Sequence, residues 1–154
     1  MQQKRPPTDT ELQKIPLFDE VEGKDFTLLQ DFTRVVHYPA DSLIFKEGTP
    51  GDSMYFILSG EIDIIKSSIV GEDVLLATLQ KGSVLGEMSL VDNAARSATA
   101  RARSESELII FTRDAFFDLV KNHSRPACMI MLKLLRTLSL RLRQADSRVA
   151  DIKQ

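Results

Sequence analysis

The chain of 154 residues has one cysteine and two histidines. A single cysteine excludes an internal disulfide, and an iron–sulfur cluster would need several cysteine ligands. His37 and His123 are far apart in the sequence, so they do not form the cluster of histidines and carboxylates that a metal site requires. No Gly-x-Ser-x-Gly element or Ser–His–Asp order indicates a hydrolase.

Long apolar runs and a strong excess of one charge are also missing. No run approaches the ~20 residues of a membrane span, and residues 1–7 lack the apolar segment of a secretory signal. The formal net charge of −2 argues against broad electrostatic binding of nucleic acid. With 43% hydrophobic and 27% charged residues, the chain is typical of one soluble globular domain, which we expect in the cytoplasm.

Turn signals divide the middle of the chain into short β-rich runs. These runs lie at 33–38, 42–46, 53–58, 61–67, 72–79, 97–103 and 107–112. Their even spacing predicts an all-β roll or barrel over about 33–112.

Two of these runs have informative patterns. In the run at 53–58, alternate residues are expected to face opposite sides of a sheet. One side would carry Met54, Phe56 and Leu58, and the other Tyr55 and Ile57. The next run departs from strict alternation at Ile64 and Ile65, which predicts a bulge or burial on both faces.

Helical patterns flank the roll on both sides. Residues 1–9 are polar and contain two prolines, so we expect a mobile segment before a domain at 10–154. Short helices are predicted near 10–14 and 23–32, and another at 113–122. The last of these would face inward with Phe116, Phe117 and Val120. The fold class is therefore α+β, a β-roll with N-terminal helices and C-terminal helices over about 113–151.

The last helix, predicted to start after Ser124, carries a heptad repeat. Apolar residues recur at alternating spacings of three and four: Cys128, Met131, Leu135, Leu138, Leu142, Ala145, Val149 and Ile152. This seam predicts a parallel homodimer, in which Cys128 is a small core residue. The alternative is a helix that packs wholly on its own domain.

Residues 86–98 carry the clearest chemical signal. Glu87 and Arg96 lie nine apart among small residues, and Ser97 follows the arginine directly. A guanidinium offers a fork of donors for phosphate oxygens, and a carboxylate accepts hydrogen bonds from a ribose hydroxyl. Gly86 lets the backbone come close to a ligand. These residues predict a pocket for one phosphate on one sugar. The plainer interpretation is a solvent-facing arginine, a glutamate in a first helical turn and a strand serine.

This stretch resembles the phosphate-binding cassette of the cyclic nucleotide-binding domain family. The family pattern is an aromatic residue, Gly-Glu, an aliphatic and a small residue, a short loop, and then Arg-small-Ala. Leu85 stands here for the common aromatic residue, and Ala95 for the proline of kinase-type members. The turn at 47–55 and Ser59-Gly60-Glu61 also match the family, and the resemblance covers about 17–150.

The resemblance implies roles for single residues. Arg96 would pair with the exocyclic phosphate oxygens, Glu87 would accept from the ribose 2′-hydroxyl, and Ser97 would donate to the phosphate. The full set of implied ligand-binding residues is Gly86, Glu87, Met88, Ser89, Arg96, Ser97 and Ala98. Members selective for cyclic GMP tend to carry threonine at position 97, so serine favours cyclic AMP. In an empty pocket we expect Glu87 to pair with Arg96.

The base of the nucleotide needs an apolar wall and a polar contact. Val74, Leu76 and Leu85 are the candidates for the wall. In this family the long helix supplies the contact to the base, and the corresponding candidates are Arg143 and Asp146. The alternative for both is a solvated charge on the helix.

The sequence as a whole predicts a sensor of a cyclic nucleotide, cyclic AMP or else cyclic GMP, with no cofactor, metal or enzymatic activity. Family members that act as transcription factors continue into a helix-turn-helix domain, whereas this sequence ends at Gln154. We therefore expect no direct binding to DNA or membrane, and an effector protein of unknown identity as the partner. Two other hypotheses are an interaction module with a repurposed roll and a metal-dependent β-barrel enzyme.

Overall fold

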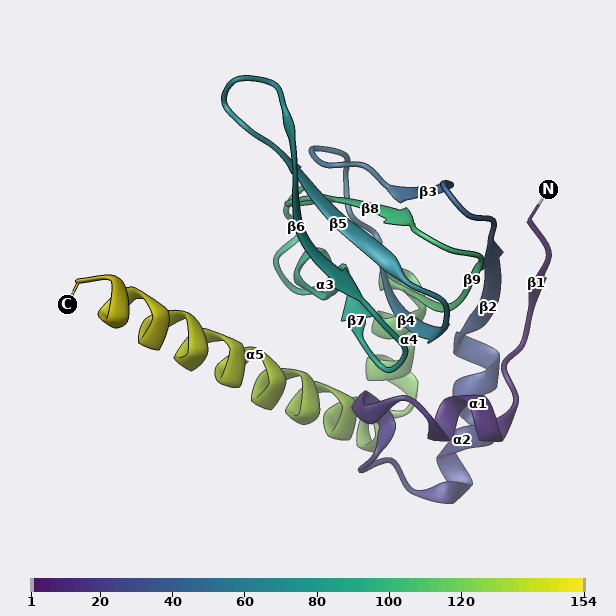
Figure 1. Cartoon of the computed structure of the whole chain (residues 1–154). Coiled ribbons are helices and arrows are strands. Elements are labelled where there is room, and N and C mark those ends of the chain that lie inside the picture. The colour runs from purple at the N-terminus through teal and green to yellow at the C-terminus, as the bar shows by residue number, and fades with distance from the viewer. Residues whose placement is uncertain (1, 154) are drawn as a thin grey trace.

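The computed structural model describes residues 2–153 and contains two β-sheets with helices on one side (Figure 1). In chain order the elements are β1 (Lys4–Arg5), α1 (Asp9–Gln13), the 3₁₀ helix η1 (Pro16–Phe18), α2 (Gly23–Phe32), β2 (Arg34–Tyr38), β3 (Leu43–Phe45), β4 (Ser53–Ser59), β5 (Ile62–Ser67), β6 (Asp73–Leu79), β7 (Val84–Leu85), α3 (Glu87–Asp92), β8 (Thr99–Ala102), β9 (Ser106–Thr112), α4 (Arg113–Asn122) and α5 (Ser124–Lys153).

The two sheets form a roll. One sheet has the strand order β1-β2-β9-β4-β7 and the other β3-β8-β5-β6, with antiparallel pairing. One apolar cluster lies between the two sheets, and a larger one lies between the five-stranded sheet and the helices. The five-stranded sheet is therefore the middle of three layers, and the predicted α+β roll is confirmed.

Strand β4 shows why this layer is in the middle. Its residues from Ser53 to Leu58 are all buried, which a strand with one face in water would not allow. Met54, Phe56 and Leu58 pack toward the helices, and Tyr55 and Ile57 pack between the sheets. The predicted division into two faces is confirmed. A register shift between Ile64 and Ile65 in β5 confirms the predicted irregularity there.

The N-terminal segment differs from the mobile stretch that we expected over residues 1–9. Lys4 and Arg5 pair with β2, and α1 begins at Asp9. Thr8 and Glu11 form a reciprocal capping box, and the Glu11 carboxylate also accepts from Arg5 at 2.9 and 2.6 Å. These donors, Arg5 first, lower the pKa of Glu11 to about 2. Local capping and one added edge strand thus order a segment whose composition is polar.

One predicted burial is wrong. Phe117 in α4 is 50% exposed, because the inward side of this helix carries Phe116 and Leu119. A neighbouring position is rotated by about 100° around the helix, which turns Phe117 outward. Cys128 is exposed in the single chain, where the first turns of α5 bury Ala127 and Ile130, and its place in a dimer seam stays a prediction.

Helix α5 packs its apolar side chains on the domain only along its first half. Ala127, Ile130 and Leu134 are buried, and Leu138 is partly buried against the same cluster. Ion pairs between exposed or partly exposed side chains also attach this half: Arg125–Glu22, Lys133–Asp19 and Arg136–Glu20. Every residue from 141 to 153 is exposed, and the helix extends away from the roll (Figure 1). The seam residues Leu135, Leu142, Val149 and Ile152 lie open to solvent.

Among the described residues no helix is long and apolar enough to cross a membrane.

Candidate functional site

The candidate site is built around a sharp turn between β7 and α3. The sequence did not predict β7, and its two residues place Gly86 at the start of the helix. Gly86 has a left-handed backbone (φ 76°), and a Cβ atom there would lie 2.4 Å from Nη1 of Arg96. Glycine is therefore required both for the turn and for the close approach of the arginine.

The backbone of Arg96 is fixed by the loop before β4. The amide of Arg96 donates to the carbonyl of Thr49 at 2.8 Å, and its carbonyl accepts from the amide of Gly48 at 2.9 Å. A single bridge between Pro50 and Ala95 continues this pairing. The turn at 47–55 thus holds the arginine in place from a position nearly fifty residues upstream.

The guanidinium of Arg96 points into the roll and is buried. The residue is 5% exposed, and its Nη1 and Nη2 donate to the carbonyl of Gly86 at 3.2 Å and to Oγ of Ser53 at 3.3 Å. Among residues 2–153 it has no carboxylate partner within ion-pair distance, and its buried Nε has no hydrogen-bond partner.

This burial is electrostatically costly. Desolvation lowers the pKa of Arg96, partly offset by Tyr55 and Asp52. A buried cation is stable only when its charge is compensated, and neutral acceptors compensate it incompletely. The arrangement is therefore suited to an anion that enters the space next to Arg96.

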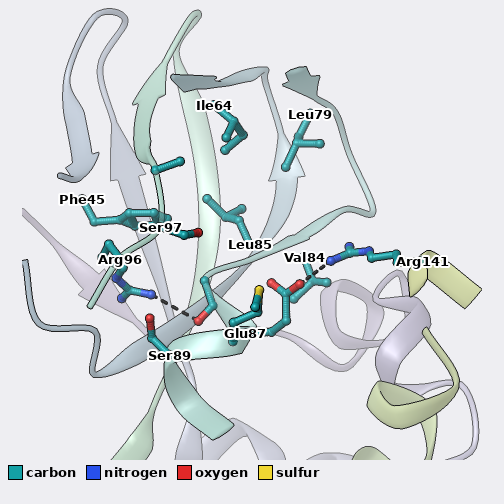
Figure 2. A pocket seen from close by; sticks show the side chains of 13 residues that line it. Phe45, Ile64, Leu79, Val84, Leu85, Glu87, Ser89, Arg96, Ser97 and Arg141 are labelled. Carbon is teal, nitrogen blue, oxygen red and sulfur yellow. Dashed lines mark hydrogen bonds and ion pairs between the residues drawn. The ribbon is translucent and has the colours of Figure 1, made fainter. Parts of the chain in front are cut away.

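That space is a cavity of about 300 Å³, at the lower end of the range for small-molecule sites, roughly 300–1,000 Å³. All seven ligand-binding residues implied by the sequence line it: Gly86, Glu87, Met88, Ser89, Arg96, Ser97 and Ala98. Figure 2 shows Arg96 and Phe45 on one side, Arg141 on the opposite side, and Ile64 and Leu79 across the roll.

Glu87 does not pair with Arg96, contrary to our expectation for an empty pocket. It is 5% exposed, and its Oε1 accepts a hydrogen bond from Nη1 of Arg141 in α5 (Figure 2). The position of Glu87 in the first turn of α3 aims its side chain toward Arg141 on α5, whereas Arg96 lies on the opposite side of the cavity (Figure 2). Within the described part of the chain, this ion pair is the only direct polar contact between α3 and α5, and the sequence did not predict it.

Four candidates for the base lie outside the cavity. Val74 is 46% exposed and Leu76 is exposed too, because they lie toward the tip of the β5–β6 hairpin, where no second layer covers them. Arg143 is two residues beyond Arg141 and therefore lies about 200° further around the helix. Asp146 is further along the exposed half of α5. Of the predicted wall, Leu85 alone lines the cavity.

The remaining wall consists of residues that sequence reasoning missed. These are Phe45, Ile64, Leu79, Val84 and Arg141. The sequence placed Ile64 and Leu79 in predicted strands of the roll but gave no indication that they face a ligand. Arg141 is one of several arginines on α5, and its contact with Glu87 distinguishes it from the others.

Arg113, at the start of α4, anchors the cassette (residues 86–98) and the loop before β4 through hydrogen bonds. It donates to the carbonyl of Gly51 at 2.8 Å, to Oδ1 of Asn93 at 2.6 Å and to the carbonyl of Ser89. Asn93 ends α3 in a left-handed conformation (φ 60°). Helix α3 therefore has a polar attachment to α5 at its first residue and to α4 beyond its last turn.

Within residues 2–153 no three His, Cys, Asp or Glu side chains gather as a metal site would require.

Comparison with known proteins agrees with this geometry. A family model described as the cyclic nucleotide-binding domain matches residues 35–123, more than half of the chain. The chain belongs to the cyclic nucleotide-binding domain family. It is 31% identical to the cyclic AMP receptor protein of Thermus thermophilus over 131 residues, which are 85% of this chain and 59% of that protein.

Two further proteins are similar to this chain, one in sequence and one in fold. A CRP-like cAMP-activated global transcriptional regulator of Mycobacterium tuberculosis is 31% identical over 94% of this chain and 62% of its own length. The crystal structure of a cyclic nucleotide-binding domain from Methylobacillus flagellatus has a TM-score of 0.86, 24% identity and coverage of 97% of this chain and 88% of that one. The chain spans about three fifths of the two curated relatives.

The contact between Gly86 and Arg96 can be tested by Gly86→Ala, with Gly82→Ala as the matched control. Both glycines are left-handed (φ 76° and 89°), so alanine at either costs about 1–2 kcal/mol. Only at Gly86 must the new methyl group also displace the guanidinium, since nothing lies within 4 Å of the methyl at Gly82. We expect urea unfolding to show a larger decrease in the free energy of unfolding for Gly86→Ala than for Gly82→Ala. Equal decreases would contradict the close contact between position 86 and the Arg96 guanidinium.

Proposed function

We propose that this domain is a sensor that binds cyclic AMP and reports its presence through α5. The single observation that supports it is the buried guanidinium of Arg96, which has no carboxylate partner within residues 2–153 and lines the cavity. A cyclic nucleotide carries one negative charge on its phosphodiester, which would compensate this cation. Charge-assisted hydrogen bonds of this kind are among the strong ones in proteins.

The other cavity residues fit the rest of the nucleotide. Ser97 next to Arg96 would donate to a phosphate oxygen, and Glu87 would accept from a ribose hydroxyl. The base would lie against the apolar side chains of Ile64, Leu79 and Val84. Cyclic AMP is the first choice among cyclic nucleotides because the two curated relatives are named for it and because position 97 is serine.

Calorimetric titration tests the proposal. The wild-type protein should bind cyclic AMP more tightly than cyclic GMP or cyclic di-GMP. Arg96→Ala should weaken binding by at least tenfold, since each charge-assisted hydrogen bond is worth about 1.5–3 kcal/mol. Arg143→Ala removes an arginine outside the cavity and should not change the affinity. No heat with any of the three nucleotides would favour the alternative of an interaction module with a repurposed roll.

The ion pair between Glu87 and Arg141 supports a route from the ligand to α5. A ribose hydroxyl that binds Glu87 changes the partners of a carboxylate that is 5% exposed, and Arg141 is the group that must adjust. Ligand would then shift the population of α5 positions relative to the roll. A partner protein would detect the part of the helix beyond Arg141, from 142 to 153.

Arg141→Gln tests this route, with Arg143→Gln as the control two residues away. Hydrogen exchange of the α5 amides is measured with and without saturating cyclic AMP. In the wild type and in Arg143→Gln we expect cyclic AMP to change exchange around Arg141. In Arg141→Gln this change should fall by at least half while binding persists. A full response in Arg141→Gln would contradict the proposed route.

We further propose that a second copy of the chain covers the exposed seam of α5. Leu142 is 64% exposed and lies outside the apolar clusters of the domain, so we expect its replacement to leave the fold intact. Leu142→Asp should turn a dimer into a monomer in sedimentation velocity, because a charge would be buried without a partner. Gln144→Asp adds the same charge beside the seam and should remain dimeric. A dimeric Leu142→Asp protein would overturn this assignment of the seam.

A further inference from the structure

Phe45 is the closest aromatic neighbour of the cation in the site. The central carbon of the Arg96 guanidinium lies 4.2 Å from the centroid of the Phe45 ring and 5.9 Å from that of Tyr55. The two rings lie 5.9 Å apart with an interplanar angle of 39°. The guanidinium therefore lies against the face of Phe45, with a second aromatic ring nearby.

Contact with a ring face differs chemically from contact with a carboxylate. A carboxylate binds the edge of a guanidinium through paired N–H groups, which are the same groups that a phosphate would use. An aromatic ring attracts the cation through its face and occupies no N–H group. Since Arg96 has no carboxylate partner in the described chain and donates only to neutral acceptors on Gly86 and Ser53, its remaining N–H groups stay available for an anion.

The backbone of β3 places Phe45 for this contact. The pairing of β3 with β8 shifts register between Leu43 and Phe45, so that Leu43 pairs with Arg101 and Phe45 with Ala100. A bulge of this kind redirects side chains, and here Ile44 and Phe45 both pack against the cluster between the sheets. Without the shift, two consecutive residues of a strand would face opposite sides.

We propose that Phe45 is a positioning residue that holds the guanidinium of Arg96 flat against its ring and leaves the N–H edge free for the phosphate of the nucleotide. This inference rests on the proposed function, since it assigns to Phe45 a part in binding the same ligand. Phe45 acts through Arg96, and its aromatic face rather than its apolar volume is the property that matters.

Phe45→Leu keeps an apolar side chain and removes the ring face, and Phe45→Tyr keeps the face. In calorimetric titration with cyclic AMP, Phe45→Leu should lose roughly 3- to 30-fold in affinity, the range of a cation–π contact. Phe45→Tyr should bind within about twofold of the wild type. Phe32→Leu is the matched control, because Phe32 is also partly buried and lies on α2 away from the cavity.

Two further measurements separate positioning from direct contact with the ligand. In an Arg96→Gln background, Phe45→Leu should have little additional effect on the affinity, measured by ligand-observed NMR at millimolar cyclic AMP. In the ligand-free protein, the ring current of Phe45 shields the Nε–H group of Arg96. Its resonance, assigned by its absence in Arg96→Gln, should move downfield in Phe45→Leu and stay in place in Phe32→Leu.

The outcomes are distinguishable. If the wild type binds cyclic AMP and Phe45→Leu binds equally well, the role of Phe45 is overturned and the proposed function stands. An equal loss with and without Arg96 would assign Phe45 to direct contact with the ligand and would also overturn the inference. If the wild type binds none of the nucleotides, the proposed function fails, and the role of Phe45 fails with it.

Discussion

The burial of one positive charge without a matching carboxylate is the constraint on which the rest of the site depends. Arg96 lies inside the roll with neutral hydrogen-bond acceptors and an aromatic face, and none of these cancels its charge. Such a group costs stability unless something outside the chain compensates it. Each neighbouring feature limits this cost or keeps the site accessible: the glycine turn, the loop that fixes the backbone of Arg96 and the open cavity.

The cassette is held by groups from distant parts of the chain. The loop at 48–50 fixes the backbone of Arg96, Arg113 fixes the end of α3, and Arg141 contacts its first residue. These groups come from the turn before β4, from α4 and from α5. A short helix of six residues has little stability of its own, so its position is set by these tertiary contacts. This explains how occupancy of the cavity and the position of α5 could depend on each other.

Local patterns predicted most of the fold. The alternation from Met54 to Leu58 placed both faces of β4, because this feature depends on neighbours in the sequence. The wall of the cavity could not be found in this way. Whether Val74 or Leu79 faces the cavity depends on how far the β5–β6 hairpin extends past the other strands. The choice between Arg141 and Arg143 depends on which face of α5 lies toward α3, and the contact between Phe45 and Arg96 depends on a bulge between strands.

The contacts that attach α5 differ in their response to ionic strength. Arg125, Lys133 and Arg136 pair with carboxylates on the surface, and concentrated salt weakens such pairs because the screening length falls from about 10 Å at 0.1 M to about 3 Å at 1 M ionic strength. The pair between Arg141 and Glu87 has one partner with a side chain only 6% exposed, so screening reaches it much less. Concentrated electrolyte would therefore loosen the surface tethers of the helix first. The ion pair between Arg141 and Glu87 would persist to the highest salt concentration, together with the apolar contacts of Ala127, Ile130 and Leu134.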